Sequence, residues 1–174
     1  IPADSVKARN VSDSGPQTAI INASIQTCSN YISIAKNINF SSYTVYSNLQ
    51  NVNLLALRLD ASPYTDTLVY MKVTNNGYAD DTDFTSLKLY QDKWPSGYDA
   101  GDIFIADLLW DGSGWVNSNI NFAISGVTYI SVYGSFSDKT TTGDTIRLQL
   151  PSNNLKTLLC DSGPTLNIWN TNIS

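Results

Sequence analysis

The chain has 174 residues, 42% hydrophobic and 14% charged, which is the composition of one folded domain of ordinary size. All fifteen acidic residues are Asp, the formal net charge is −5, and the absence of His excludes Ser-His-Asp catalysis and His-ligated zinc. The ten basic residues are scattered, which argues against a nucleic-acid partner, and no apolar run approaches the roughly 20 residues of a transmembrane helix.

Residues 1–16 are polar, contain two prolines and show no regular period over their length. We expect them to form a tail or an added strand outside the main domain, which then spans residues 17–174. The chain begins with Ile rather than Met, which favours a removed signal peptide or a boundary within a longer protein. A secreted, extracellular location is therefore predicted.

Short segments of strand type follow, rich in β-branched and aromatic residues. They are residues 19–27, 43–46, 52–59, 67–74, 84–90, 103–109, 115–119, 128–133, 145–150 and 165–169. Turn signals such as Asn75-Asn76-Gly77 and Asp111-Gly112-Ser113-Gly114 separate them. This pattern predicts an all-β fold, a single Greek-key sandwich of immunoglobulin-like or jelly-roll type.

The two cysteines, Cys28 and Cys160, lie near opposite ends of the chain. In an oxidising compartment a disulfide between them would close a loop of about 130 residues and stabilise the fold by roughly 4–5 kcal/mol. The alternative is two buried free thiols. Four Asn-X-Ser sequons are candidate glycosylation sites in a host that glycosylates: Asn10, Asn22, Asn39 and Asn172.

Acidic residues are concentrated between Asp80 and Asp111, where eight of the fifteen occur. Calcium takes six to eight oxygen ligands from Asp side chains and backbone carbonyls, and Gly97 and Gly101 let the backbone turn so that such groups converge. The candidate calcium ligands are Asp92, Asp99, Asp102, Asp80, Asp81 and Asp83. The spacing is not that of an EF-hand, and the alternative is a solvated acidic loop.

Aromatic side chains suggest a second kind of site. Trp94, beside a proline, and Trp115, after a glycine, are candidates for stacking on sugar rings, although aromatic residues in a sandwich commonly belong to the core. Asp99 and Asp102 could in principle act as an acid–base pair on a glycoside. Since nothing in the sequence supplies a nucleophile or an oxyanion hole, no enzymatic activity is expected.

Residues 86–106 include Leu89-Tyr90-Gln91-Asp92 and Gly97-Tyr98-Asp99-Ala100-Gly101-Asp102. This stretch resembles the LYxDxxxxGxxDxGDxxIA element of secreted bacterial and archaeal β-sandwich modules, and residues 142–148 resemble their closing strand. The resemblance covers roughly residues 52–150. It implies a calcium-binding loop in a module of the surface-layer or adhesin type.

In size, tail and composition the chain is more loosely similar to subunits of extracellular filaments, such as archaeal cannulae and biofilm matrix fibres. That similarity implies assembly in which a terminal strand of one subunit completes the sheet of the next. The sequence thus favours a non-enzymatic structural protein, a calcium-stabilised subunit of a homopolymeric filament, tube or surface layer. The alternative is a carbohydrate-binding or adhesive module that binds polysaccharide through Trp94 and Trp115.

Overall fold

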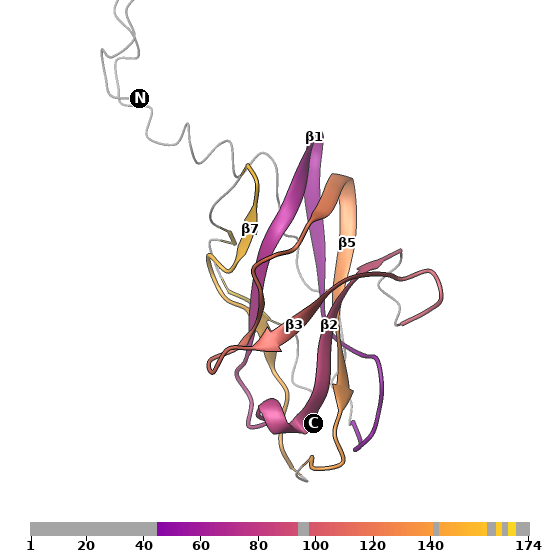
Figure 1. Cartoon of the computed structure of the whole chain (residues 1–174), viewed down its shortest axis with the longest axis vertical. Coiled ribbons are helices and arrows are strands. Elements are labelled where there is room, and N and C mark those ends of the chain that lie inside the picture. Colours follow the sequence, from indigo (N-terminus) through magenta and orange to yellow (C-terminus); the bar gives the residue numbers. More distant parts are fainter. Residues whose placement is uncertain (1–44, 94–97, 141–142, 160–162, 165–166, 170–174) are drawn as a thin grey trace, which may run out of the picture.

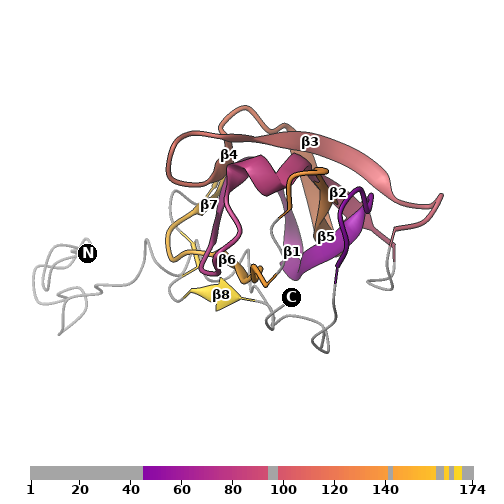
Figure 2. The same cartoon turned by 90° about the horizontal axis from the view of Figure 1, so that it is seen from below.

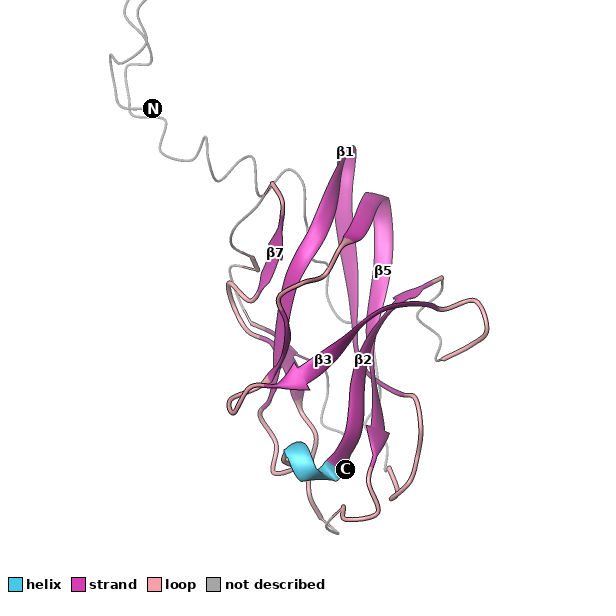
Figure 3. Ribbon diagram, in the orientation of Figure 1, coloured by secondary structure: helices cyan, strands magenta, loops and turns pink. Residues whose placement is uncertain are grey.

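The computed structural model describes residues 45–93, 98–140, 143–159, 163–164 and 167–169. This part of the chain consists of strands, one short 3-10 turn and connections, and it contains no α-helix (Figure 3). The prediction of an all-β fold is confirmed. The elements are β1 Val52–Asn75, η1 Asp81–Asp83, β2 Phe84–Asp92, β3 Ile103–Trp110, β4 Trp115–Asn117, β5 Phe122–Phe136, β6 Leu148–Leu150, β7 Leu155–Thr157 and β8 Ile168–Trp169.

The two longest strands, β1 and β5, run antiparallel side by side through the molecule (Figure 1). Both bend at the same level, because the pairing shifts between Asp60 and Thr65 of β1 while Gly126 of β5, opposite, adopts φ 59°. A bulge of this kind lets a strand turn from one wall of a β fold into the next. The segments 52–59 and 67–74, predicted as two strands, are therefore the two arms of one bent strand.

Five strands form a closed ring. β2 pairs with β5, β3 with β2, and β4 with both β3 and β1. β4 and β5 follow one another along β1, with Ile120 N donating to Val69 O between them. The structure differs here from the predicted Greek-key sandwich. Because bent β1 belongs to both walls, the strands close into a barrel instead of forming two clearly separate sheets.

The short strands β6, β7 and β8 extend the second arm of β1. Leu68 pairs with Phe122 on one side and Thr157 on the other, so β7 lies on the edge of β1 opposite β5. β6 pairs with the end of β1, and β8 pairs with β6. Figure 2, seen from below, places β6 and β8 on one side of the molecule and β3 on the other.

The interior of the barrel is aliphatic, with a small aromatic group at one end. Phe84 packs edge-on against Trp115 and at a tilt of 38° against Phe136, with ring centroids 5.2 Å apart in both pairs. Each large side chain buried here contributes about 1.5–3 kcal/mol. Fully buried members include Leu55, Leu57, Leu59, Leu68, Met71, Leu87, Leu89, Ile124 and Ile130.

Several features predicted from the sequence lie outside the described residues. They are the tail 1–16, the strand 19–27, Cys28, Cys160, Trp94 and the four sequon asparagines Asn10, Asn22, Asn39 and Asn172. Within the described part, no helix has the length and apolar character needed to cross a membrane.

Candidate functional site

The six candidate calcium ligands fall into two groups at opposite ends of β2. Asp80, Asp81 and Asp83 precede the strand, whereas Asp92 ends it. Nine strand residues at about 3.3 Å each place roughly 30 Å between the groups. A single site that uses both groups is therefore ruled out within one chain.

The first group caps the 3-10 turn η1. The Asp80 carboxylate accepts hydrogen bonds from Thr82 N (2.8 Å) and Thr82 Oγ1 (2.7 Å), and Asp83 Oδ2 accepts one from Asp80 N (2.7 Å). These bonds, the Thr82 hydroxyl first, hold the pKa of Asp80 below its ordinary value. The reciprocal pattern is that of a capping box, so the carboxylates of Asp80 and Asp83 satisfy backbone N–H groups at the start of the turn.

Asp92, at the end of β2, is only 2% exposed. Successive strand residues point to opposite faces, so Asp92 lies on the outer face of the barrel with Ser131 and Tyr133 of β5. Ser131 Oγ donates to Asp92 Oδ2 at 2.9 Å and the Tyr133 hydroxyl donates at 3.2 Å. Asn53 Nδ2 of β1 donates to Ser131 Oγ at 3.3 Å, which extends this buried polar network across three strands.

The connection from β2 to β3 brings Asp99 and Asp102 back toward this network. Asp99 N donates to Asp102 Oδ2 at 3.0 Å, and Gly101 N donates to Asp99 Oδ1 at 2.5 Å, so both carboxylates shape the turn. Asp102 Oδ1 is shielded from solvent, and no residue in the described part donates a hydrogen bond to it. Asp102 Oδ1 is thus a shielded oxygen at which a ligand would meet no competing hydrogen bond from the described residues.

Three tyrosines cover the outer face beside the carboxylates. Tyr90, Tyr98 and Tyr133 meet edge to face, with ring centroids 5.4–5.5 Å apart. Burial, followed by the negative charges of Asp92 and Asp102, raises the pKa of Tyr133 far above its ordinary value. Burial also raises the pKa of Tyr90. Tyr133 therefore keeps its proton and donates a hydrogen bond to Asp92.

The metal-binding capacity of this arrangement is limited. Among the described residues no three Cys or Asp side chains come together as they would around a metal ion. The structure brings Asp92 and Asp102 to the same tyrosine and assigns Asp99 to the turn. A calcium ion here would need further oxygens from backbone carbonyls and water, because two carboxylates supply fewer than six ligands.

The predicted sugar-stacking role of Trp115 is not compatible with its position. The residue is 4% exposed, and its ring packs against Phe84 and against Trp110, whose centroid is 4.7 Å away. Trp115 faces inward because it is the β4 residue that closes the aromatic end of the core. The more exposed ring of the pair is that of Trp110, at 41%.

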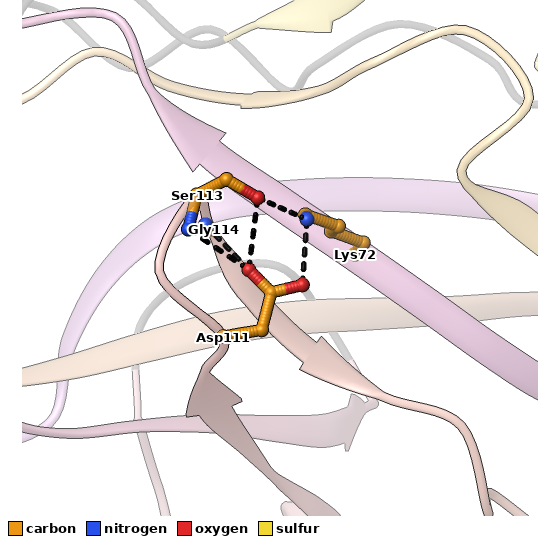
Figure 4. Close-up of polar contacts among 4 residues, drawn as sticks. All are labelled: Lys72, Asp111, Ser113 and Gly114. Carbon is orange, nitrogen blue, oxygen red and sulfur yellow. Dashed lines mark hydrogen bonds and ion pairs between the residues drawn. The ribbon is translucent and has the colours of Figure 1, made fainter.

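A polar group that the sequence did not predict fixes the β3–β4 turn to β1 (Figure 4). Lys72 Nζ donates to Asp111 Oδ2 and to Ser113 Oγ, both at 2.7 Å. Asp111 Oδ1 accepts from the backbone N–H of Ser113 and of Gly114, both at 3.0 Å. The Lys72 ammonium and these donors lower the pKa of Asp111 to about 2.

The strand β3 exposes apolar side chains at both of its ends. Ile103 and Phe104 are exposed at the start, and Leu109 and Trp110 at the end. Asp107 is the only charged residue of this strand. An apolar surface of this kind is characteristic of a contact with another molecule.

Some residues of the site could be recognised from the sequence, and others could not. Asp111-Gly112-Ser113-Gly114 is recognisable as a turn, but its partner Lys72 lies 39 positions away. Tyr133 alternates with the core residues Ile130 and Val132 in the same strand, which is consistent with an outward side chain. Its contact with Asp92 depends on strand pairing that the sequence does not show.

Comparisons with known proteins give no relative. A scan against models of protein families, a search of curated proteins and a search of solved structures each found no match to this chain. The function is therefore argued from the residues themselves.

Proposed function

We propose that this chain is a non-enzymatic structural protein of the cell exterior, a subunit that assembles with its own copies into a filament, tube or layer. Assembly proceeds by addition of a strand from one copy to the sheet of the next. The single observation that supports this most is the apolar surface of β3, where Phe104 is 50% and Leu109 67% exposed. Covering such a surface is favourable by about 25 cal/mol per Å².

Calcium is proposed as the stabilising ion, at the end of β2. The support is the convergence of Asp92 and Asp102 on Tyr133, together with the shielded Asp102 Oδ1. Two nearby carboxylates repel one another, and a divalent cation between them would relieve that repulsion. An ion that binds only the folded or assembled state stabilises that state by mass action.

The alternative, a carbohydrate-binding module, has less support. Of its two proposed stacking residues, Trp115 is buried and Trp94 lies outside the described residues. β3 has only one polar side chain, Asp107, among its exposed aromatic and aliphatic residues. A ligand site for a sugar needs apolar side chains and several hydrogen-bonding groups together. The exposed residues of β3 therefore favour assembly over carbohydrate binding.

Deletion of residues 1–16 tests the strand-addition part of this proposal. We expect the truncated chain to keep the circular dichroism spectrum of the full chain, because every described strand lies beyond residue 44. We also expect it to stay monomeric in sedimentation velocity under conditions in which the full chain forms large species. A truncated chain that assembles like the full chain would show that these residues are not the added strand.

A further inference from the structure

One edge of β3 carries backbone groups that no strand of the described part of the chain pairs with. β3 pairs with β2 through residues 103–108, but with β4 only through Leu109 and Trp110. On the edge away from β2, no described residue pairs with the backbone of residues 103–106, and the next carbonyl, Asp107 O, accepts from Asn117 Nδ2 at 2.8 Å. We call residues 103–106 the open edge. Figure 2 shows β3 along the outside of the molecule.

The open edge lacks the residues that usually prevent strand addition. Natural edge strands are protected by lysine, proline, inward-pointing charge or a β-bulge. Residues 103–106 are Ile-Phe-Ile-Ala, and Ile103 and Phe104 are exposed. The register shift opposite Leu89 and Tyr90 leaves Ile105 as a one-residue bulge, the one protecting feature among residues 103–106. Backbone groups and apolar side chains on this edge are both available to an added strand.

The charges beside the open edge indicate which kind of segment could pair with it. Asp102 and Asp107 flank the open edge, and neither makes an ion pair within the described part of the chain. Pairing β3 with β3 of a second copy would bring these carboxylates near their counterparts, and like charges placed across a strand pair destabilise it. The occupant that fits is an extended segment with basic side chains.

Residues 1–44 contain such a segment. They carry three basic and two acidic residues, whereas the rest of the chain carries seven basic and thirteen acidic. Lys7 and Arg9 alternate with Val6 and Ala8, so in an extended conformation both cations share one face and both apolar side chains the other. Apolar and basic groups are then presented together, as the open edge requires.

We propose that residues 6–10 of one copy add as a strand to the open edge of β3 in a neighbouring copy, with the basic face formed by Lys7 and Arg9 beside the exposed Asp107. This inference rests on the proposed function and specifies its donor and its acceptor. Main-chain hydrogen bonds and contact with Phe104 provide affinity, and the charge pairs select the segment.

Charge reversal on both sides of the contact tests the assignment with the full chain. Asp107→Lys alone, and Lys7→Asp with Arg9→Asp, are each expected to weaken association about tenfold, measured by light scattering against concentration at low salt with millimolar calcium. Combining the three substitutions restores the favourable pairing at position 107 with the charges exchanged and is expected to recover most of the association. Phe104→Lys, which places a protecting lysine on the edge, should weaken it as well.

Controls separate this contact from the general effects of charge and from misfolding. Asp138→Lys and Leu158→Lys alter exposed residues away from β3 and are expected to associate like the unchanged chain. Lys7→Asp with Arg9→Asp changes no described residue, so its effect does not depend on the stability of the barrel. Circular dichroism confirms that each variant is folded.

The outcomes distinguish the inference from the function on which it rests. If the unchanged chain associates and the reversals at Asp107 and at Lys7 and Arg9 do not weaken it, the open edge is not the acceptor, while assembly itself stands. If each reversal weakens association and the combination does not restore it, the pairing of these charges is wrong. If the unchanged chain remains monomeric at every concentration and salt with calcium present, both the proposed function and this inference fail.

Discussion

Individual residues on the outer face of the barrel form a second buried layer that is polar. Tyr133 donates to Asp92 from a position that is almost fully buried, and Ser131 supplies a further donor. Buried acceptors that lose a donor cost more than the bond itself contributes, because their desolvation is no longer compensated. The hydroxyl of Tyr133 should therefore matter to stability.

Replacing Tyr133 with Phe removes this hydroxyl and keeps the ring. We expect the free energy of unfolding, measured by urea denaturation, to fall by about 1–2 kcal/mol. Tyr78→Phe is the matched control, because Tyr78 is 82% exposed and should show almost no change. Equal effects of the two substitutions would mean that the bond to Asp92 contributes nothing.

The ion pair between Lys72 and Asp111 should make the free energy of unfolding depend on pH. The folded-state pKa of Asp111 is about 2, below its ordinary value of 3.8, so its stabilising effect is present above pH 4 and is lost as the pH falls toward 2. Asp111→Asn should therefore flatten the loss of stability between pH 4 and pH 2 in urea denaturation. Lys72→Met should flatten it in the same way, and unchanged profiles in both variants would contradict this role.

At the scale of elements, the bend in β1 and β5 decides how the barrel closes. Gly126 lies at this bend with φ 59°, in the left-handed region, and a Cβ there would meet no atom within 4 Å. A side chain at position 126 is therefore disfavoured by the backbone conformation and not by a steric clash. Gly126→Ala is expected to lower the free energy of unfolding by about 1–2 kcal/mol.

Asparagine tolerates left-handed backbone better than alanine does, so Gly126→Asn should cost clearly less in the same denaturation experiment. An equal loss for Asn and Ala would show that the left-handed conformation is not what this position requires.

The strands were largely predictable and the way they join was not. Local alternation located parts of β1, β2, β3 and β5, but segment 128–133 proved to be the middle of a strand that begins at Phe122. The bulge joins segments 52–59 and 67–74 only because β5 pairs with both of them, which is a long-range effect. β7, three residues long, is held by pairing with β1 and has too few residues for a pattern of its own.

The acidic residues also show which features local sequence predicts and which depend on long-range contacts. Asp80 and Asp83 stand three positions apart at the start of a turn, a spacing that favours capping, and the structure uses them in that way. The convergence of Asp92 and Asp102 on Tyr133 depends on how the loop returns over β5, so sequence spacing alone predicts acidic density and not the contact. Trp115 follows Gly114 in a turn-like context, yet the pairing of β4 with β1 directs it into the core.

In the whole molecule, the proposed calcium site and the proposed contact between copies lie next to each other. Asp92 and Asp102 lie at the end of β2 and just before β3, and the open edge begins at the next residue, Ile103. An ion bound to Asp102 would hold the residue that directly precedes the acceptor strand. Calcium and assembly should therefore be coupled, so that each favours the other.

The measurement that tests this central claim is negative-stain electron microscopy of the chelator-treated full chain before and after addition of millimolar calcium. We expect ordered fibres, tubes or sheets that form only with calcium, and Asp102→Asn should require more calcium to form them, whereas Asp138→Asn should not. Monomers that are unchanged by calcium, or ordered assemblies that form equally well in the presence of chelator, would contradict the account.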